Sequence, residues 1–505
     1  MAVKIFEAPS TEFCEDYKVK INCREVELNT ARVSAFPFNR RWPGHQRDKE
    51  QSELVNFVSL SANEPLLFEI IPKKNFEKVV IRPESLNIHP DISEGVIRFT
   101  LDKHQYFTVE PFGRNNALHV FVDPEFDYGI DIGDENVIYF GAGEHEVGTI
   151  TLESNQTLFI DEGAVVYGCI KAIDARNIKI LGNGILDNSK NKERILFECN
   201  AENNTSAIKN AKRQHTVQLE YCEDIMIKGI TIRESLVYNI RPIACKNLNI
   251  SNVKIIGCWR YNSDGIDMHN CEDVLIGNCF IRTFDDSVCI KGFDCYYDGD
   301  VEKAVKEAMY RNGKAYDVFK NVLVKNCVIW NDWGKCLEIG AETRAEKIEN
   351  IRFEDCHIIH VTHRVLDINN VDYADVNNVT FENISVEFDE IIPEGKIQTR
   401  DDEKYEITDK DYAPYLIAVE TEFHHEYSAG GTRRGINRDI TFKNIRLSGR
   451  QKPVMYFKGY DDEHKTKNIT VENLYLNGKL LSEIPEEDFI TDAFTENIKY
   501  RISEK

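Results

Sequence analysis

A ten-residue pattern returns eight times along this chain, and it constrains the fold more than any other feature of the sequence. Each copy has a polar pair, apolar residues at alternate positions, a second polar pair and further alternation. Alternation of period two is typical of strands, not of helices. The copies are EDIMIKGITI from Glu223, KNLNISNVKI from Lys246, EDVLIGNCFI from Glu272, KNVLVKNCVI from Lys320, ENIRFEDCHI from Glu349, NNVTFENISV from Asn377, RDITFKNIRL from Arg438 and KNITVENLYL from Lys467.

The spacing of the copies indicates how the strands are stacked. Successive copies begin 23 to 29 residues apart, except for two steps of 48 and 61 residues. Steps of the shorter kind match one turn of a parallel β-helix, in which each turn lies on the previous one. The longer steps predict turns with insertions, near residues 294–318 and 387–437. We therefore predict an all-β chain in which residues 137–505 form a β-helix, a solenoid.

Three cysteines occupy the same place in three copies of the pattern: Cys279, Cys327 and Cys356. Equal repeat positions stack, so these residues are expected to form a buried ladder of small apolar side chains. The sequence contains no CxxC pair and no zinc-type spacing. All 14 cysteines are therefore expected to be free thiols.

Residues 1–136 have a different organisation. Short alternating segments such as DYKVKINC from Asp16, EPLLFEIIP from Glu64 and ALHVFVDP from Ala117 are separated by turn residues, without the repeat pattern. This arrangement is typical of an antiparallel β-sandwich. We predict a separate N-terminal sandwich, packed at the end of the β-helix.

Charge and hydropathy exclude several kinds of partner. The chain has 505 residues, with 62 Lys and Arg against 85 Asp and Glu, so its formal net charge is −23. Such a field repels phosphate backbones and the basic residues form no patch, which argues against nucleic-acid binding. No apolar run approaches the ~20 residues that a membrane span needs. The N-terminal residues lack the apolar core of a signal peptide, which predicts a cytoplasmic protein.

Three carboxylates recur at close to the coil spacing: Asp264, Asp285 and Asp286. Residues one coil apart lie about 4.8 Å apart, so the three acids are expected within ~5–10 Å of each other. This range overlaps the ~6.5–9.5 Å between the acid and the base of an inverting glycosidase. Crowding also raises the pKa of at least one carboxyl, as a general acid requires. Because neighbouring residues of a flat strand face opposite ways, Asp285 and Asp286 must lie at a bend.

At these residues the chain resembles the glycoside hydrolases of family 28, the polygalacturonases and their relatives. NSDG from Asn262 matches the first motif of the family and the Asp285-Asp286 pair matches the second, at the family spacing. Lys291 fits the form in which a lysine follows the pair, as in several exo-acting members. The segments beginning at Phe140 and Gly182 resemble the first coils of the family. The N-terminal sandwich is also similar to that of family 49, the dextranases and isopullulanase.

The resemblance covers about residues 137–480. It implies a right-handed parallel β-helix and an inverting hydrolase that needs no metal or other cofactor. By position, Asp285 would be the general acid, and Asp264 and Asp286 would hold and deprotonate the attacking water. Substrate contacts would come from Lys291 and Asn262, with Glu338 as an extra acid near the cleft.

The chain departs from the family at two basic motifs. Gly334-Lys335-Cys336 stands where the family has Gly-His-Gly, and His363-Arg364-Val365 stands where Arg-Ile-Lys is expected. These basic residues of the family bind the uronate carboxylate, so their loss favours a neutral sugar. Lys335 could restore one positive charge beside Arg364, which keeps a galacturonide substrate open.

We therefore expect an inverting hydrolase that trims neutral oligosaccharides from one end. One alternative is an exo-acting hydrolase of galacturonides. A polysaccharide lyase, which would need calcium-binding acids and a basic catalyst, and a non-catalytic carbohydrate-binding solenoid are further alternatives.

Overall fold

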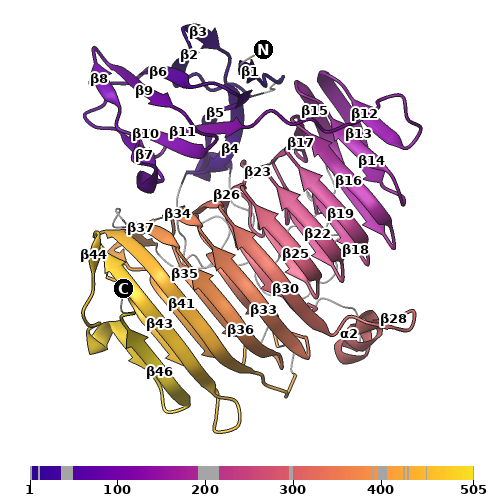
Figure 1. The fold of residues 1–505 in the computed structure, drawn as a ribbon, viewed down its shortest axis with the longest axis vertical. Helices are drawn as coiled ribbons and strands as arrows, with labels where there is room; N and C mark the ends of the chain where they lie inside the picture. The colour runs from indigo at the N-terminus through magenta and orange to yellow at the C-terminus, as the bar shows by residue number, and fades with distance from the viewer. Residues whose placement is uncertain are drawn as a thin grey trace.

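A computed structural model describes the chain apart from several short segments and residues 191–214 (Figure 1). The described residues are 3–9, 12–35, 49–190, 215–294, 300–388, 392–395, 406–424, 427–428, 431–450 and 452–503. Within these residues, thirty-one strands form one continuous sheet that winds as a right-handed parallel β-helix, which confirms the predicted fold class. No described helix is long and apolar enough to cross a membrane.

Each coil of the helix contributes strands to three parallel rows. The first row carries the first half of the repeat pattern, and its register pairs Glu223 with Lys246 and Lys246 with Glu272, as equal repeat positions predict. Its strands are β12 (Val137–Phe140), β14 (Thr157–Ile160), β16 (Arg176–Gly182), β19 (Glu223–Lys228), β22 (Lys246–Ser251), β25 (Glu272–Gly277), β30 (Val318–Lys325), β33 (Lys347–Glu354), β36 (Asp375–Glu382), β41 (Ile436–Gly449), β43 (Thr466–Leu476) and β46 (Thr495–Arg501).

The second row carries the second half of the pattern. It contains β17 (Ile185–Asp187), β20 (Thr231–Arg233), β23 (Lys254–Ile255), β26 (Phe280–Thr283), β31 (Val328–Asn331), β34 (His357–His360) and β37 (Ser385–Phe388), which pairs with the end of β41. The long strands β13 (Gly143–Thr151) and β15 (Ala164–Ile173) span the second and third rows, and β44 (Lys479–Leu480) turns back along β43.

The strands of the third row do not contain the repeat pattern, and they carry the candidate site. Its strands are β18 (Val217–Glu220), β21 (Ile240–Ile243), β24 (Ile266–His269), β27 (Val288–Lys291), β32 (Lys335–Ala341), β35 (Arg364–Asn370), β40 (Tyr415–Thr421), β42 (Met455–Lys458) and β45 (Phe489–Thr491). Its inward side chains join one continuous apolar core with those of the other rows.

The polar pairs of the pattern form the corners of the coils. The second residue of each pair adopts a left-handed conformation, for example Asn321 at φ 60° and Asn350 at φ 58°. Asn and Asp tolerate this conformation because their short side chains bond locally. The corner amides also bond from coil to coil, as Asn350 Nδ2 does to Asn321 Oδ1 at 3.2 Å. These ladders fix where each coil turns.

The predicted cysteine ladder is present. Cys279, Cys327 and Cys356 are fully buried free thiols in the core. Two of the 14 cysteines lie outside the described residues, and the other twelve are free. Burial and the neighbouring thiol of Cys327 raise the pKa of Cys279, so the ladder serves packing and not reactivity.

The N-terminal residues form two packed sheets. One contains β1 (Val3–Ile5), β4 (Asn29–Ser34), β5 (Ser52–Ala62), β7 (Val80–Arg82), β10 (Tyr106–Arg114) and β11 (Leu118–Asp123). The other contains β2 (Tyr17–Ile21), β3 (Arg24–Val26), β6 (Leu66–Pro72), β8 (Asp91–Ser93) and β9 (Val96–Leu101). Their pairs are antiparallel except β5–β11, which is parallel, so the antiparallel prediction misses one pair.

The sandwich lies along the flank of the β-helix, so the expectation that it packs at the end is wrong (Figure 1). Its buried contacts run along the second row, from Arg233 of β20, whose Nη1 donates to Thr30 O at 2.9 Å, to Glu387 of β37, which bonds Arg82. Phe280 and Trp330 pack in the same interface core. The cause is that several outward residues of the second row are large or apolar and need a cover.

The two insertions flank the third row. The first contains α2 (Val301–Met309) and the hairpin of β28 (Tyr310–Arg311) and β29 (Lys314–Ala315); part of it, residues 295–299, lies outside the described residues. The second contains β38 (Ile392–Gly395) and β39 (Ile407–Tyr412). The region 387–437 is not one insertion, because β40 within it completes a coil by pairing with β35.

Candidate active site

The two neighbouring aspartates lie at a bend between β26 and β27, as their shared direction requires. The bend is held by Thr283 Oγ1 and Asn331 Nδ2, which donate to the carbonyl oxygen of Asp285 at 2.6 and 2.7 Å. Gly334 of the next coil packs directly on it, since a Cβ there would lie 2.5 Å from Asp285 C and Asp286 N. Any larger residue at position 334 would displace the pair.

The structure brings the three predicted aspartates together. Asp264, Asp285 and Asp286 each place a carboxylate oxygen within 4.8 Å of the other two, and all three are buried. The cluster is therefore slightly tighter than the coil spacing predicts. It is also nearer to the ~5–5.5 Å of retaining enzymes than to the ~6.5–9.5 Å of inverting ones, so the spacing alone does not favour inversion.

One ammonium group faces four carboxylates. Lys291 Nζ lies 2.8 Å from Asp267, 3.6 Å from Glu342 and 3.8 Å from both Asp264 and Asp286. Negative charge thus exceeds positive charge around it, and some of these carboxyls must keep their protons. Lys291 already stands where a bound cation would contact Asp264 and Asp286, so the cluster carries its own positive charge.

The environments of Asp285 and Asp286 push their pKa values apart. Burial and the adjacent charge of Asp286 raise the pKa of Asp285 well above its usual range. Burial also acts on Asp286, but the Lys335 and Lys291 cations and the Lys335 backbone N–H, 3.0 Å from Oδ1, hold the pKa of Asp286 below its usual range. Burial and the charge of Asp267 raise the pKa of Asp264. A protonated and an ionised carboxyl side by side are the requirement for acid–base catalysis.

Two basic residues stand next to the aspartates. Lys335 and Arg364 are register partners in β32 and β35, so their backbones are one strand spacing apart. Each is anchored to an acid three residues on: Lys335 to Glu338, and Arg364 Nη1 to Asp367 at 3.0 Å. Arg364 also bonds Glu420 at 2.6 Å.

A cavity of about 310 Å³ opens over these groups. The predicted residues Asn262, Lys291, Lys335 and Arg364 line it, and the three aspartates form its floor. Glu338 does not line it and is fully buried beneath Lys335. Further lining residues are Tyr238, Tyr261, Trp333, Gly334, Ala341, Glu342, His363, Asn369, Glu422, His424 and Tyr427.

Sequence reasoning missed three parts of the site. Asp267 is not among the residues predicted from the sequence, yet its carboxylate is the nearest one to Lys291 Nζ, at 2.8 Å. Glu342 and Tyr238, which also line the cavity, are not among the residues predicted from the sequence either. The available signal was the period of two in the third row, which points Asp267 and Glu338 outward from β24 and β32.

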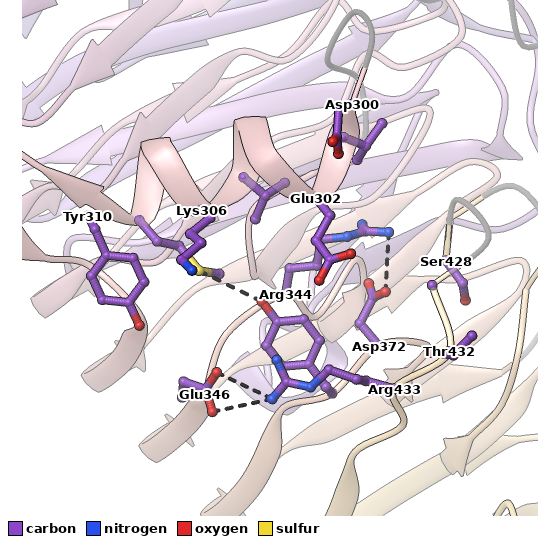
Figure 2. A pocket seen from close by; sticks show the side chains of 15 residues that line it. Asp300, Glu302, Lys306, Tyr310, Arg344, Glu346, Asp372, Ser428, Thr432 and Arg433 are labelled. Carbon is purple, nitrogen blue, oxygen red and sulfur yellow. Dashed lines mark hydrogen bonds and ion pairs between the residues drawn. The ribbon is translucent and has the colours of Figure 1, made fainter.

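A second pocket, of about 570 Å³, lies between α2 and residues 428 and 431–433 (Figure 2). Ion pairs line it: Arg344 pairs with Asp372 at 3.2 Å and Arg433 with Glu346 at 3.3 Å. Both arginines of this pocket are thus paired with an acid, whereas Lys291 of the aspartate cavity faces four acids. We take the aspartate cavity as the candidate active site.

The third row of this parallel β-helix thus carries clustered carboxylates of the kind that acid–base catalysis requires. The model of glycosyl hydrolases family 28 matches residues 143–395. This chain therefore belongs to glycoside hydrolase family 28.

Individual relatives are more distant. A polygalacturonase from Gossypium barbadense is 25% identical over 232 residues, covering 43% of this chain and 53% of that protein. One from Brassica napus is 31% identical over 123 residues, covering 23% and 30%. This chain thus spans about half the length of the first, and less of the second. Among solved structures, Dex49A from Penicillium minioluteum has a TM-score of 0.55 at 14% identity, covering 99% and 96% of the two chains, and shares the fold.

Proposed function

We propose that this protein hydrolyses short galacturonides from one chain end. The observation that carries the substrate class is the stacking of Lys335 and Arg364 beside the aspartate cluster. Two cations at this spacing offer a uronate carboxylate a favourable site that the aspartates alone would deny it. The relatives whose names are polygalacturonase support the same class.

The neutral sugar favoured by the sequence finds no support among the relatives, and the galacturonide alternative is the better one. In this proposal Lys335 takes the part of the lysine that the linear motif expects two residues after Arg364. The coil register places Lys335 beside Arg364 from the neighbouring coil instead.

In this proposal Asp285 is the general acid that protonates the leaving glycosidic oxygen. Its raised pKa keeps the proton available at neutral pH. Asp286, with its lowered pKa, is ionised and accepts a proton from the attacking water. Asp264 Oδ1 is buried and makes no hydrogen bond within the described residues, so it is free to hold that water.

Attack from a held water on the face opposite the leaving group gives inversion, which the family resemblance also implies. Proton NMR of the first product tests this. Retained anomeric configuration would show that one aspartate acts as a nucleophile instead.

The size of the cavity supports action on chain ends. About 310 Å³ is near the lower limit for small-molecule sites and leaves room for a short saccharide. Residues after β40, including Glu422 and Tyr427, wall one side of it.

The decisive experiment measures reducing-sugar release from di- and trigalacturonate and from neutral glucan, galactan and fructan oligomers. The proposal expects trigalacturonate to be cleaved fastest, with monomer as the first product. Faster cleavage of a neutral oligomer would instead favour the neutral sugar that the sequence predicts. Unsaturated products would show a lyase, and no release from any substrate would favour a binding protein.

A further inference from the structure

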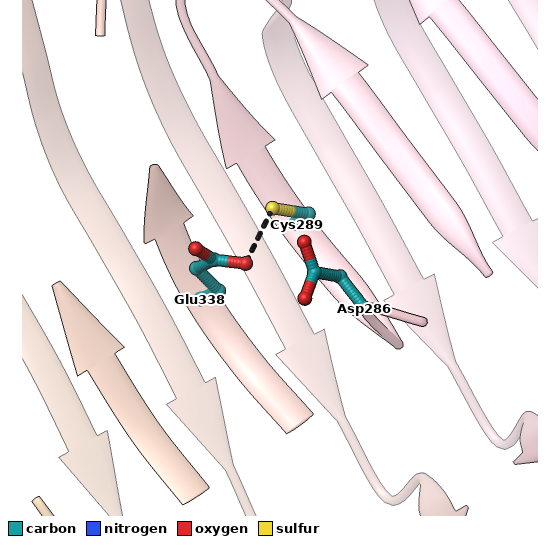
Figure 3. A group of neighbouring side chains, drawn as sticks. All are labelled: Asp286, Cys289 and Glu338. Atoms are coloured by element: carbon teal, nitrogen blue, oxygen red, sulfur yellow. Dashed lines mark hydrogen bonds between the residues drawn. The ribbon is translucent and has the colours of Figure 1, made fainter. Parts of the chain in front are cut away.

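Glu338 lies beside Asp286, one member of the aspartate cluster. It belongs to β32, has no exposed surface, and has one oxygen within 4.8 Å of both an Asp286 oxygen and Cys289 Sγ (Figure 3). Cys289 Sγ donates to Glu338 Oε2 at 3.1 Å, and Lys335 Nζ bonds Oε1. The same Lys335 donates its backbone N–H to Asp286. Lys335 therefore bridges Glu338 and Asp286.

The neighbouring coil offers a matched comparison. Asp367 of β35 is the register partner of Glu338, is equally buried, and is likewise bonded by a cation three residues earlier, Arg364. The charge of Asp367 is one of those that raise the pKa of Glu338. Asp286, by contrast, is not among the main charges that act on Asp367. The difference between the two positions is therefore proximity to Asp286.

We propose that Glu338 is a positioning residue that keeps its proton and donates it in a hydrogen bond to Asp286, holding Asp286 ionised and aimed at the attacking water. This inference rests on the proposed function for its catalytic meaning. The proton stays on Glu338 throughout, and no bond to substrate involves it. Lys335 and Cys289 fix the orientation of the Glu338 carboxyl from two sides.

The surrounding charges agree with this assignment. Glu338 faces Asp286 and Lys291 from the β26–β27 side, Lys335 from its own strand and Asp367 from β35. Burial and the charge of Asp286 raise the pKa of Glu338 well above its usual range, more than the cations lower it. The carboxyl oxygens of Glu338 and Asp286 lie within 4.8 Å of each other, and a proton that Glu338 shares with Asp286 accounts for part of the lowered pKa of Asp286.

The test compares Glu338→Leu, Glu338→Gln and the matched control Asp367→Asn. Glu338→Leu removes the donor, so the acid limb of the kcat profile with trigalacturonate should move up by about one pH unit. Glu338→Gln keeps a neutral donor and should restore the wild-type limb. Asp367→Asn should leave the limb in place, although KM can change through Arg364. An unmoved limb in Glu338→Leu, or equal limbs in both Glu338 variants, would overturn the proposal.

A second measurement needs no turnover. Infrared spectra of the whole protein at neutral pH should show one protonated carboxyl fewer in Glu338→Gln than in the wild type. The same number in both proteins would overturn the inference even if galacturonides are cleaved. If the wild type cleaves no galacturonide but the band is lost, the proposed function fails and the protonated Glu338 stands. Should Glu338→Leu fail to fold, this comparison decides.

Discussion

Two flanks of the β-helix bury charged side chains. On one flank the buried ions are paired, and on the other the acids outnumber the bases. On the flank covered by the sandwich, Lys254 pairs with Asp123 at 2.9 Å, and Asp332 lies between Arg282 and Arg114. On the flank with the cavity, Lys291 faces four carboxylates.

The difference separates stability from chemistry. A buried charge with a matched partner contributes to docking, and removing either partner leaves the other uncompensated. In a cluster with excess negative charge, the carboxylates repel each other. This repulsion shifts their pKa values away from the usual range, as proton transfer in a catalytic site requires. Substitutions on the covered flank should therefore lower stability and spare activity, whereas substitutions in the aspartate cluster should lower activity and spare stability.

The largest expected effect is on the covered flank. Asp332→Asn should lower the free energy of unfolding by about 3–5 kcal/mol, because Arg282 and Arg114 lose a buried counter-ion that they share. Denaturant unfolding measures it. The activity of the folded fraction should stay near that of the wild type. A change below ~1 kcal/mol would show that the pairs do not secure the interface.

The second prediction concerns the cavity flank. Asp285→Asn should lower kcat by at least ~100-fold, the lower end of a general-acid contribution. Its unfolding temperature should be equal to that of the wild type or higher, since a repelled carboxyl is removed. Calorimetry and initial rates on one preparation provide both values. Wild-type activity would remove Asp285 from the mechanism.

The pH dependence of stability sharpens the comparison. His360 and Arg82 lower the pKa of Glu110 to about 2 although burial opposes them, so Glu110 stabilises the fold above its usual pKa of 4.5. That contribution, up to ~3 kcal/mol, should be lost as pH falls from 4.5 to about 2.

The corresponding measurement compares unfolding of Glu110→Gln with the wild type at several pH values. The deficit of the variant should be full at pH 7 and vanish near pH 2. Asp285→Asn should show the reverse, an advantage that grows as pH rises above 3.8, because the folded pKa of Asp285 is raised. Parallel curves for both variants would contradict the contrast between the flanks.

The smallest predicted effect tests the basic pair. Arg364→Met should raise KM for trigalacturonate about tenfold, or ~1.4 kcal/mol, with a smaller change in kcat. Arg364→Lys, the charge-conserving control, should recover part of the affinity. An equal loss for a neutral oligosaccharide would mean that Arg364 shapes the cavity without recognising a carboxylate.

The coil architecture is readable from the sequence because two rows carry a repeated local pattern. Glu223, Lys246 and Glu272 head successive copies and are register partners in the structure. The Asp264 and Asp285-Asp286 cluster follows from that register and from the motifs. These parts depend on spacing along the chain, which a sequence records directly.

The remaining parts depend on contacts between distant segments. The pairing of Arg82 with Glu387 joins residues 305 positions apart, and no local pattern predicts the flank that the sandwich covers. The role of Lys335 was open for the same reason. Its neighbour Arg364 is set by the coil register of the third row, which lacks the repeat and contains long insertions.

The asparagine corners have a consequence for how such a protein diversifies. Asn321, Asn350 and their equivalents form corners of the coils and lie within first-row strands, whereas the aspartate cavity lies at the third row. Outward residues of the third row can therefore be exchanged without altering the path of the chain. Lys335, which stands where the family resemblance leads us to expect a histidine, is one such outward residue. The residues that set the path of the chain are therefore different from those that line the cavity. Substrate preference can change through a few cavity side chains while the fold is kept.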